Sequence, residues 1–369
     1  MTKLKWIILV VSCIGFYSCE KKSEQIIKEI DIKEPAGRMM LSDLCDSIWC
    51  IPLETKSQSL FKKPDKLIVY DQRFYIMDKS GAEKILVFNE DGSYCHSIGT
   101  KGNGQGEYIT IEDFTLDEEK EQVVILSYPS KVYIYDLNGN FIHAKELGKS
   151  LIWNICSYKD GYVCSTNHQT YTEGEEAYLL FFYDKNFSLQ NKMLPVLPVH
   201  ITMPPFVSCP LYTTDNEIVY FDNFTSQLHL ISLNQNAEFD SNLLYSCHFT
   251  CEPEVSEEVY KDVMSFFDRQ NEFSFFIESY YANDTVYAFI AKQGKLAFLM
   301  ADIHTGQGRF SWYNKYYPEI LTSKDGYFYS FVSPTQLMED KNVLFHIIND
   351  EYEPQIGDNF LVTRFILNH

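Results

Sequence analysis

The chain has 369 residues, of which 45% are hydrophobic and 15% aromatic, and its formal net charge is −20. Such an acidic surface repels nucleic acid and anionic headgroups, so we expect no nucleic-acid partner. The acidic residues are dispersed among aliphatic and aromatic ones, which argues against disorder for most of the chain. Abundant Phe and Tyr suit pleated, half-buried surfaces, and the composition therefore predicts a strand-rich globular body.

The first 18 residues have the pattern of an export signal. Lys3 and Lys5 precede an apolar run from Trp6 to Phe16, and a small residue, Ser18, stands before Cys19. The run is too short to span a bilayer comfortably, and no later stretch approaches the roughly 20 apolar residues that a spanning helix needs. The sequence predicts export and no integral membrane helix.

This segment resembles a bacterial lipoprotein signal, with bulky residues before Ser18 as in lipoproteins of Bacteroidota. The resemblance implies cleavage after residue 18 and acylation of Cys19 by palmitate-like chains, which would anchor the protein in the cell envelope, in the outer membrane, facing the periplasm or the surface. The alternative is a plain secretory signal with a chance cysteine. Cleavage would remove two lysines and no acid, changing the net charge from −20 to −22. Residues 19–39 are polar and charged, and we expect them to form a tether.

One sequence phrase recurs through the remainder of the chain: an aromatic strand, a turn containing Asp, Asn or Gly, and a second strand. Its clearest copies are KILVFNEDGSYCHSI and KVYIYDLNGNFIHAKEL, whose turn glycines, Gly92 and Gly139, are about 47 residues apart. Further copies begin at Tyr178, Gln227 and Lys295. The spacing is that of one propeller blade. Residues 40–369 are therefore predicted to form an all-β, six-bladed β-propeller of four-stranded antiparallel blades.

Two segments depart from this repeat. DSIWCIPLE, from Asp46, is a lone strand phrase, and we expect it to close the ring by pairing with the C-terminal strand in the last blade. Residues 253–271 are predicted to hold one short helical insertion, because Val259, Val263, Phe266 and Phe267 recur at helical spacing. This helix would cover a sheet edge or the channel mouth, or act as a mobile lid.

The second blade resembles an NHL-type repeat. The matching positions are a glycine-rich lead-in, an aromatic residue, two aspartates, a basic residue and a turn glycine. They are Gly102, Gly104, Gly106, Tyr108, Asp117, Lys131, Tyr135, Asp136 and Gly139. With the N-terminal signal, the whole chain resembles the six-bladed, NHL- or TolB-like propeller lipoproteins of Bacteroidota. That family implies a fold and a location, but no settled activity.

Ligands of propellers bind at the channel mouth, on polar side chains of the inner strands. The expected inner strands IEDFTL, LIWNICSY and FFIESYY place Asp113, Asn154 and Glu278 there. Their oxygens are suitable calcium ligands, as in the lactonase-like propellers that this fold also resembles. The alternative is that these side chains only hydrate a narrow channel.

Aromatic residues gather between the fifth and sixth units in RFSWYNKYYPE, as Trp312, Tyr313, Tyr316 and Tyr317. Exposed flat rings stack on sugars, so this cluster is a candidate glycan platform. Packing between blades is the alternative, and the more common role for such residues.

Two covalent modifications are also predicted. Cys156 and Cys164 flank a hairpin symmetrically and are candidates for a cross-strand disulfide in an oxidising compartment. Weaker candidate pairs are Cys45 with Cys50 and Cys247 with Cys251; free buried thiols are the alternative for all of them. Ser47, in Asp-Ser-Ile, resembles the O-glycosylation sequon of Bacteroidota.

The chain carries no HExxH and no GxSxG motif. We therefore favour a non-catalytic envelope lipoprotein that serves as a binding or assembly platform, held at the membrane by its N-terminal anchor, with a protein or glycan partner. The alternatives are a calcium-dependent, lactonase-like hydrolase or lyase at the channel mouth and a carbohydrate-binding accessory protein.

Overall fold

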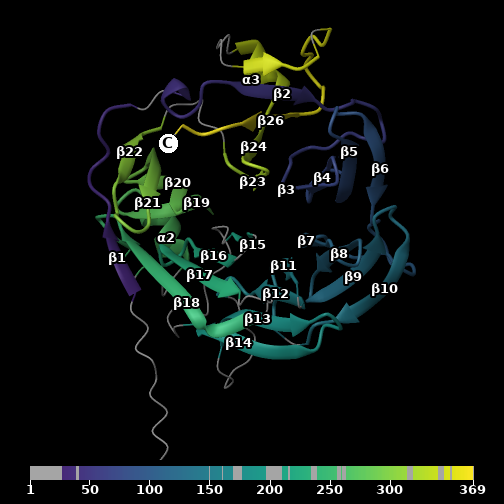
Figure 1. Ribbon diagram of the computed structural model, residues 1–369, viewed down its shortest axis with the longest axis horizontal. Helices are drawn as coiled ribbons and strands as arrows, with labels where there is room; N and C mark the ends of the chain where they lie inside the picture. Colours follow the sequence, from purple (N-terminus) through teal and green to yellow (C-terminus); the bar gives the residue numbers. More distant parts are fainter. Residues whose placement is uncertain are drawn as a thin grey trace, which may run out of the picture.

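The chain forms a six-bladed β-propeller, with six mainly antiparallel sheets arranged in a ring around a central channel (Figure 1). The predicted fold class is confirmed. The computed structural model describes residues 27–38, 41–148, 150–159, 161–168, 177–196, 210–214, 217–233, 239–255, 259, 263–313, 319–339, 345–349 and 351–368. The predicted signal peptide and Cys19 lie outside this part of the chain.

The first three blades each consist of four consecutive strands. Blade 1 contains β3 (Lys66–Tyr70), β4 (Arg73–Asp78), β5 (Lys84–Asn89) and β6 (Tyr94–Ile98). Blade 2 contains β7 (Asp113–Asp117), β8 (Gln122–Ser127), β9 (Lys131–Asp136) and β10 (Phe141–Glu146). Blade 3 contains β11 (Asn154–Tyr158), β12 (Gly161–Ser165), β13 (Tyr178–Asp184) and β14 (Leu189–Pro195).

The next two blades continue the pattern. Blade 4 contains β15 (Leu211–Thr213), β16 (Glu217–Asp222), β17 (Gln227–Leu233) and β18 (Phe239–Thr250). Blade 5 contains β19 (Ser274–Ala282), β20 (Thr285–Lys292), β21 (Lys295–Asp302) and β22 (Gly308–Trp312).

Blade 6 joins the two ends of the propeller. Its strands are β23 (Thr322–Lys324), β24 (Tyr327–Val332), β26 (Leu361–Phe365), β2 (Ile48–Pro52) and β25 (Phe345–Ile347). β2 pairs antiparallel with β26, from Ile48 opposite Phe365 to Pro52 opposite Leu361, as expected for DSIWCIPLE. The ring is therefore closed within blade 6, whose strands come from both ends of the chain.

Blade 4 carries a fifth strand that the sequence did not reveal. β1 (Ile27–Asp31) pairs parallel with β18, and the side chains of Ile30 and Ile32 are buried in the core between blades 4 and 5. The tether predicted for residues 19–39 is therefore shorter, because the chain belongs to the folded body from residue 27.

The recurring turn aspartates have a local function. Asp136, the last residue of β9, accepts hydrogen bonds from the backbone N–H groups of Asn138 and Asn140. Asp184, which ends β13, accepts the corresponding bonds, and Asp302, which ends β21, accepts bonds from the N–H groups two and three residues on. Side-chain acceptors at this position satisfy backbone donors that the tight turn leaves unpaired.

Two short α-helices lie within the described residues: α2 (Val263–Arg269) and α3 (Pro334–Glu339). A short 3₁₀ helix, η1 (Leu41–Asp43), precedes β2. α2 is the predicted insertion, and Phe266 packs with Val259, Phe224 and Phe273 in a small apolar cluster. This packing agrees with the first predicted role of the helix, in which it covers part of blades 4 and 5. The prediction of a single helical insertion was incomplete, because α3 interrupts blade 6 between β24 and β26.

The register of β11 and β12 separates the two cysteines predicted to form a disulfide. Cys164 lies opposite Ile155, and Cys156 lies opposite Val163, so a shift of one residue places the thiols on opposite faces of the sheet. The disulfide prediction was wrong, and both residues are buried free thiols. Cys45, Cys50, Cys247 and Cys251 are also free and buried. In the part of the chain that is described, no helix is long and apolar enough to cross a bilayer.

Candidate functional site

The innermost strands of the six blades are β3, β7, β11, β15, β19 and β23, and they surround the central channel (Figure 1). Their first residues meet at one face of the ring: Asp113, which begins β7, contacts Lys66, which begins β3, and the backbone of Ile155 in β11. We call this the mouth face. The opposite face, which holds the turns between the first and second and between the third and fourth strands of each blade, is called the turn face.

The connections at the two faces differ greatly in length. Those on the turn face are short, such as 71–72, 118–121, 137–140 and 303–307. Within the ring, the connections of nine or more residues begin and end at the mouth face, and they span residues 53–65, 99–112, 166–177, 196–210, 251–273, 313–321 and 333–360. Residues 32–47 differ, because they link the mouth-face end of β1 to the turn-face start of β2. Binding residues are commonly found on loops that a rigid scaffold positions, so the mouth face is the candidate functional surface.

Asp113 is confirmed as an inner-strand residue, but its carboxylate is used between blades. One oxygen accepts a hydrogen bond from Lys66 Nζ at 2.8 Å, and the other accepts one from the backbone N–H of Ile155 at 2.8 Å. Asp113 is buried and thus links blades 1, 2 and 3. This pairing leaves little of the carboxylate for a metal ion.

Asn154 and Glu278 also lie on inner strands, and each has its own partner. Asn154 accepts a hydrogen bond from Ser165 at 3.1 Å, whereas Glu278 contacts Glu319. The nominated calcium ligands therefore have three different sets of partners. Among the residues that the structure describes, no group of three or more His, Cys, Asp and Glu side chains is arranged to hold a metal ion.

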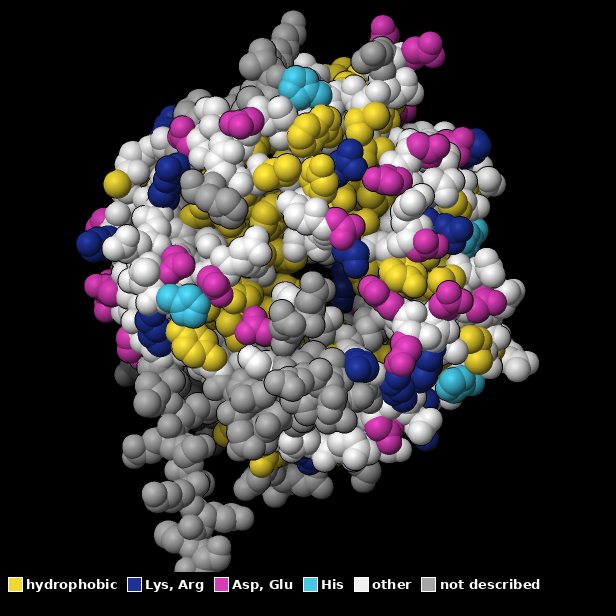
Figure 2. Space-filling view, in the orientation of Figure 1, with side chains coloured by type: hydrophobic (Ala, Val, Ile, Leu, Met, Phe, Trp, Pro, Cys, Tyr) yellow, Lys and Arg dark blue, Asp and Glu magenta, His cyan; other side chains and the backbone are white. Residues whose placement is uncertain are grey.

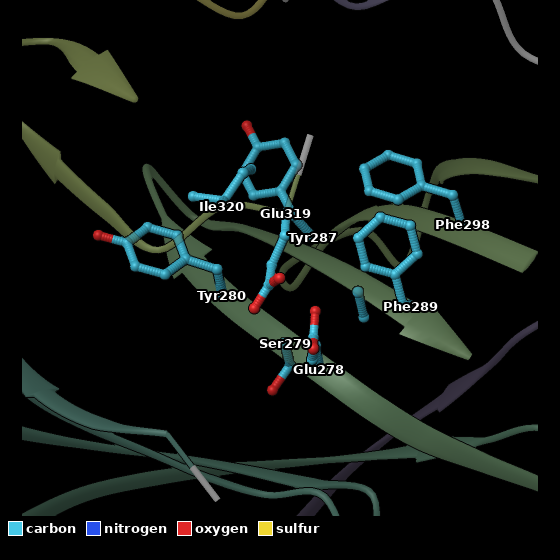
Figure 3. Close-up of a pocket in the computed structure, with 9 residues that line it drawn as sticks. Glu278, Ser279, Tyr280, Tyr287, Phe289, Phe298, Glu319 and Ile320 are labelled. Atoms are coloured by element: carbon cyan, nitrogen blue, oxygen red, sulfur yellow. The ribbon is translucent and has the colours of Figure 1, made fainter. Parts of the chain in front are cut away.

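The contact between Glu278 and Glu319 is the most unusual polar feature of the channel. Glu278 comes from the middle of β19 in blade 5, and Glu319 precedes β23 in blade 6. Their carboxyl groups are hydrogen bonded and point toward each other in the small cavity between the two blades (Figure 3). The cavity walls are mostly aromatic, formed by Tyr280, Tyr287, Phe289 and Phe298.

Burial and mutual repulsion make this pair bind a proton tightly. Burial, followed by the charge and hydrogen bond of Glu319, raises the pKa of Glu278 to about 8, against a smaller opposing effect of Lys63. The pKa of Glu319 is also raised, by the partial desolvation of its carboxyl group, although the residue as a whole is exposed. Near neutral pH the two groups therefore share one proton.

The aromatic cluster predicted as a glycan platform is divided by the structure. Tyr313 packs edge-on against Phe289 at 5.5 Å, so its ring takes part in the packing of blade 5. Trp312 is half-buried, with Lys295 Nζ 5.5 Å from its ring centre. Tyr316 and Tyr317 lie outside the described residues. Of the two described rings, that of Tyr313 packs within the blade and that of Trp312 lies beside a lysine ammonium.

A hydrophobic patch occupies the mouth face where blades 6 and 1 meet. Phe61 stacks on Phe360 at 5.9 Å, and Phe331 contacts Phe360 edge-on at 6.5 Å. Leu60 and Ile356 are 46% and 84% exposed. We call the three rings, together with Leu60 beside Phe61 in the sequence and Ile356 four residues before Phe360, the apolar patch. Figure 2 shows hydrophobic side chains gathered on the visible face over the blade of β24 and β26.

Sequence reasoning also missed a buried histidine pair at the mouth face. His168 Nε2 lies 2.8 Å from Asp222 Oδ2, and His229 Nδ1 lies 2.8 Å from the hydroxyl of Ser246. Burial opposes ionisation of Asp222, but its contacts with His168 and Thr225 outweigh this and lower its pKa to about 2. Burial lowers the pKa of His229 to about 4. Because His168 and Asp222 come from different blades, their contact fastens blade 3 to blade 4.

Comparisons with known proteins support the fold and leave the chemistry open. Residues 27–358 match a family described as a domain of unknown function, DUF4934. The chain belongs to this family. No curated protein matches it.

Two solved structures share the architecture. A protein of Bacteroides fragilis described as exported superposes with a TM-score of 0.69 at 15% identity, covering 93% of this chain and 100% of the other. A DUF4221 member from Bacteroides vulgatus gives a TM-score of 0.54 at 8% identity, covering 88% and 97%. At these identities the likeness shows the fold alone.

Proposed function

We propose that this protein is a lipid-anchored component of the cell envelope, held by Cys19, whose propeller is a non-catalytic platform that binds a protein partner at the mouth face. The concentration on that face of the long connections within the ring carries the proposal. The exported neighbour from Bacteroides fragilis supports the location. Ser47 is half-buried immediately before β2, and we retain it as a candidate O-glycosylation site.

The apolar patch indicates the kind of partner. The three rings are half-buried, and Leu60 and Ile356 beside them in the sequence are exposed. Hydrophobic surface that gathers in one place marks sites that bind other macromolecules. Phe61, Phe331 and Phe360 are held in contact with one another, so their rings lose little conformational freedom on binding. Rigid aromatic anchors of this type contribute most of the binding energy in many protein interfaces.

A substitution within the apolar patch, compared with one elsewhere on the surface, tests the proposal. Ile356→Glu places a charge in the patch, and Ile142→Glu places the same charge on β10, where Ile142 is 44% exposed. Each variant is expressed in the source bacterium and crosslinked in intact envelopes. We expect Ile356→Glu to lose a specific crosslinked partner that Ile142→Glu retains. Equal retention or equal loss in the two variants would count against the proposal.

The anchor has a separate test. The Cys19→Ala variant should be exported without acylation and move from the membrane fraction to the aqueous fraction. Membrane retention by that variant would refute lipid anchoring and leave the binding surface unaffected.

A further inference from the structure

The segment that follows the proposed anchor is held in a fixed place. β1 adds to the outer edge of blade 4 in parallel register with β18, from Ile27 opposite Ser246 to Asp31 opposite Thr250. The register is stabilised by the burial of Ile30, which is 3% exposed. The position and direction in which the chain enters the propeller are therefore set by the fold.

Contacts at each end of this segment give its direction relative to the two faces. Near the start of β1, Lys28 Nζ donates hydrogen bonds to the carbonyl of Ile303, at 2.7 Å, and to that of His304. Both acceptors lie in the connection between β21 and β22, on the turn face. Beyond the end of β1, Glu34 forms an ion pair at 3.1 Å with Lys292, which ends β20 at the mouth face. The chain therefore enters at the turn face and runs toward the mouth face.

The length of the linking segment limits how the body can stand at a membrane. Seven residues, 20–26, separate Cys19 from β1. Fully extended, they reach roughly 25 Å, and as a flexible chain about 15 Å. Passing from the turn face to the mouth face along a strand of five residues already takes about 17 Å. For the mouth face to lie on the bilayer, the linker would have to be almost fully extended.

We infer that the anchored protein stands with its turn face toward the membrane that holds it and presents the mouth face, including the apolar patch, to a protein partner on the side away from that membrane. This inference rests on the proposed acylation of Cys19. It excludes the lipid of the anchoring leaflet as the ligand of the apolar patch.

Charge is compatible with this arrangement. The turn face carries exposed acidic side chains, namely Asp71, Glu90, Asp91, Glu118, Glu119 and Glu121. They repel anionic headgroups at close range, but salt screens the repulsion beyond about 8 Å. A linker of about 15 Å lets the turn face remain beyond this range. The orientation of the propeller is thus set by where the linker joins it, and not by attraction of the turn face to the membrane.

Energy transfer to a labelled bilayer tests the orientation. Acylated full-length protein is reconstituted in vesicles of phosphatidylethanolamine and phosphatidylglycerol that carry an acceptor dye on their headgroups. A donor dye is attached to a cysteine introduced at Asn138, exposed on the turn face, or at Ser80, exposed on the mouth face. Cys95, which is only half-buried, is replaced by Ser in both proteins to avoid background labelling. A second pair of labelled proteins carries 20 Gly and Ser residues inserted between Ser23 and Glu24.

We expect the donor at Asn138 to be quenched more strongly than the donor at Ser80. The insertion should reduce the quenching of both donors and the difference between them, because a longer linker no longer holds the propeller at a fixed orientation to the membrane. Equal quenching, or stronger quenching at Ser80, in protein that remains vesicle-bound would overturn the orientation while leaving the anchor intact. Vesicle binding that survives Cys19→Ser would instead overturn the anchor, and this inference with it.

Discussion

Glu278 and Glu319 share a hydrogen bond between their carboxyl groups across the boundary of blades 5 and 6. Two carboxyl groups form such a bond only when one of them is protonated. The contact therefore joins the two blades as long as the pair retains its proton, and it becomes a repulsion when both groups ionise.

Replacing Glu278 by Gln should change how stability depends on pH. The pKa of Glu278 is raised to about 8, from an unfolded value near 4.5, so the folded state holds a proton that the unfolded state releases. The contribution of this proton to the free energy of unfolding is fully present below pH 4.5 and is lost as the pH rises to 8. Because Glu319 contacts solvent, we expect Glu278→Gln to be more stable than wild type by about 1–2 kcal/mol at pH 9, and nearly equal at pH 5.

Urea unfolding at several pH values measures this difference. Glu118→Gln removes an exposed carboxylate on the turn face and serves as the control, with no comparable change in pH dependence. Parallel stability curves for wild type and Glu278→Gln between pH 5 and 9 would show that the pair does not hold a proton.

The ion pair of Lys66 with Asp113 should contribute more to stability than a similar pair at the surface. Lys66→Met leaves the buried Asp113 carboxylate without its cation, which we expect to cost about 3 kcal/mol. Lys101→Met removes an equally close contact with Glu83, in which both side chains are exposed, and should cost less than about 1 kcal/mol. Chemical denaturation of the two variants compares them directly. Similar losses would contradict the assigned role of Asp113 between blades.

The docking of β1 on blade 4 should also contribute to the stability of the folded protein. Ile30 is buried between blades 4 and 5, so Ile30→Ala removes packed methyl groups and should cost about 2–3 kcal/mol. Ile142→Ala, at an exposed position on β10, should cost less than about 0.5 kcal/mol. Equal thermal unfolding midpoints for the two variants would mean that β1 is not part of the cooperative fold.

The buried His229 should weaken the fold in mild acid. Its pKa is lowered to about 4 from an unfolded value of 6.5, so its stability contribution is present above pH 6.5 and is lost as the pH falls to 4. Protonation of His229 should lower the free energy of unfolding by up to about 3 kcal/mol. His229→Gln should show a shallower decline of the unfolding free energy over that interval, whereas His143→Gln, exposed on β10, should follow wild type. A decline of unchanged steepness in His229→Gln would refute this assignment.

Much of the fold could be read from local patterns. The alternation within each strand and the turn aspartates, such as Asp136 and Asp184, act over a few residues, so they recur visibly along the chain. The lone phrase around Ile48 also revealed the closure, because an unpaired strand at one end of a ring requires a partner at the other.

The candidate site depended on tertiary structure. Asp113, Asn154 and Glu278 were correctly placed on inner strands, but what they contact depends on residues far away in the sequence, including Lys66 and Glu319. A spacing pattern cannot specify these partners, because they meet only when neighbouring blades pack side by side.

The sequence by itself determined a repeating, strand-rich ring closed by its two ends, since short-range patterning sets strands and turns. Only the tertiary structure decided the register that separates Cys156 from Cys164, the docking of β1 on blade 4 and the shared proton of Glu278 and Glu319. The physical reason is that register, edge pairing and the pKa of a buried group all depend on which distant side chains exclude water together.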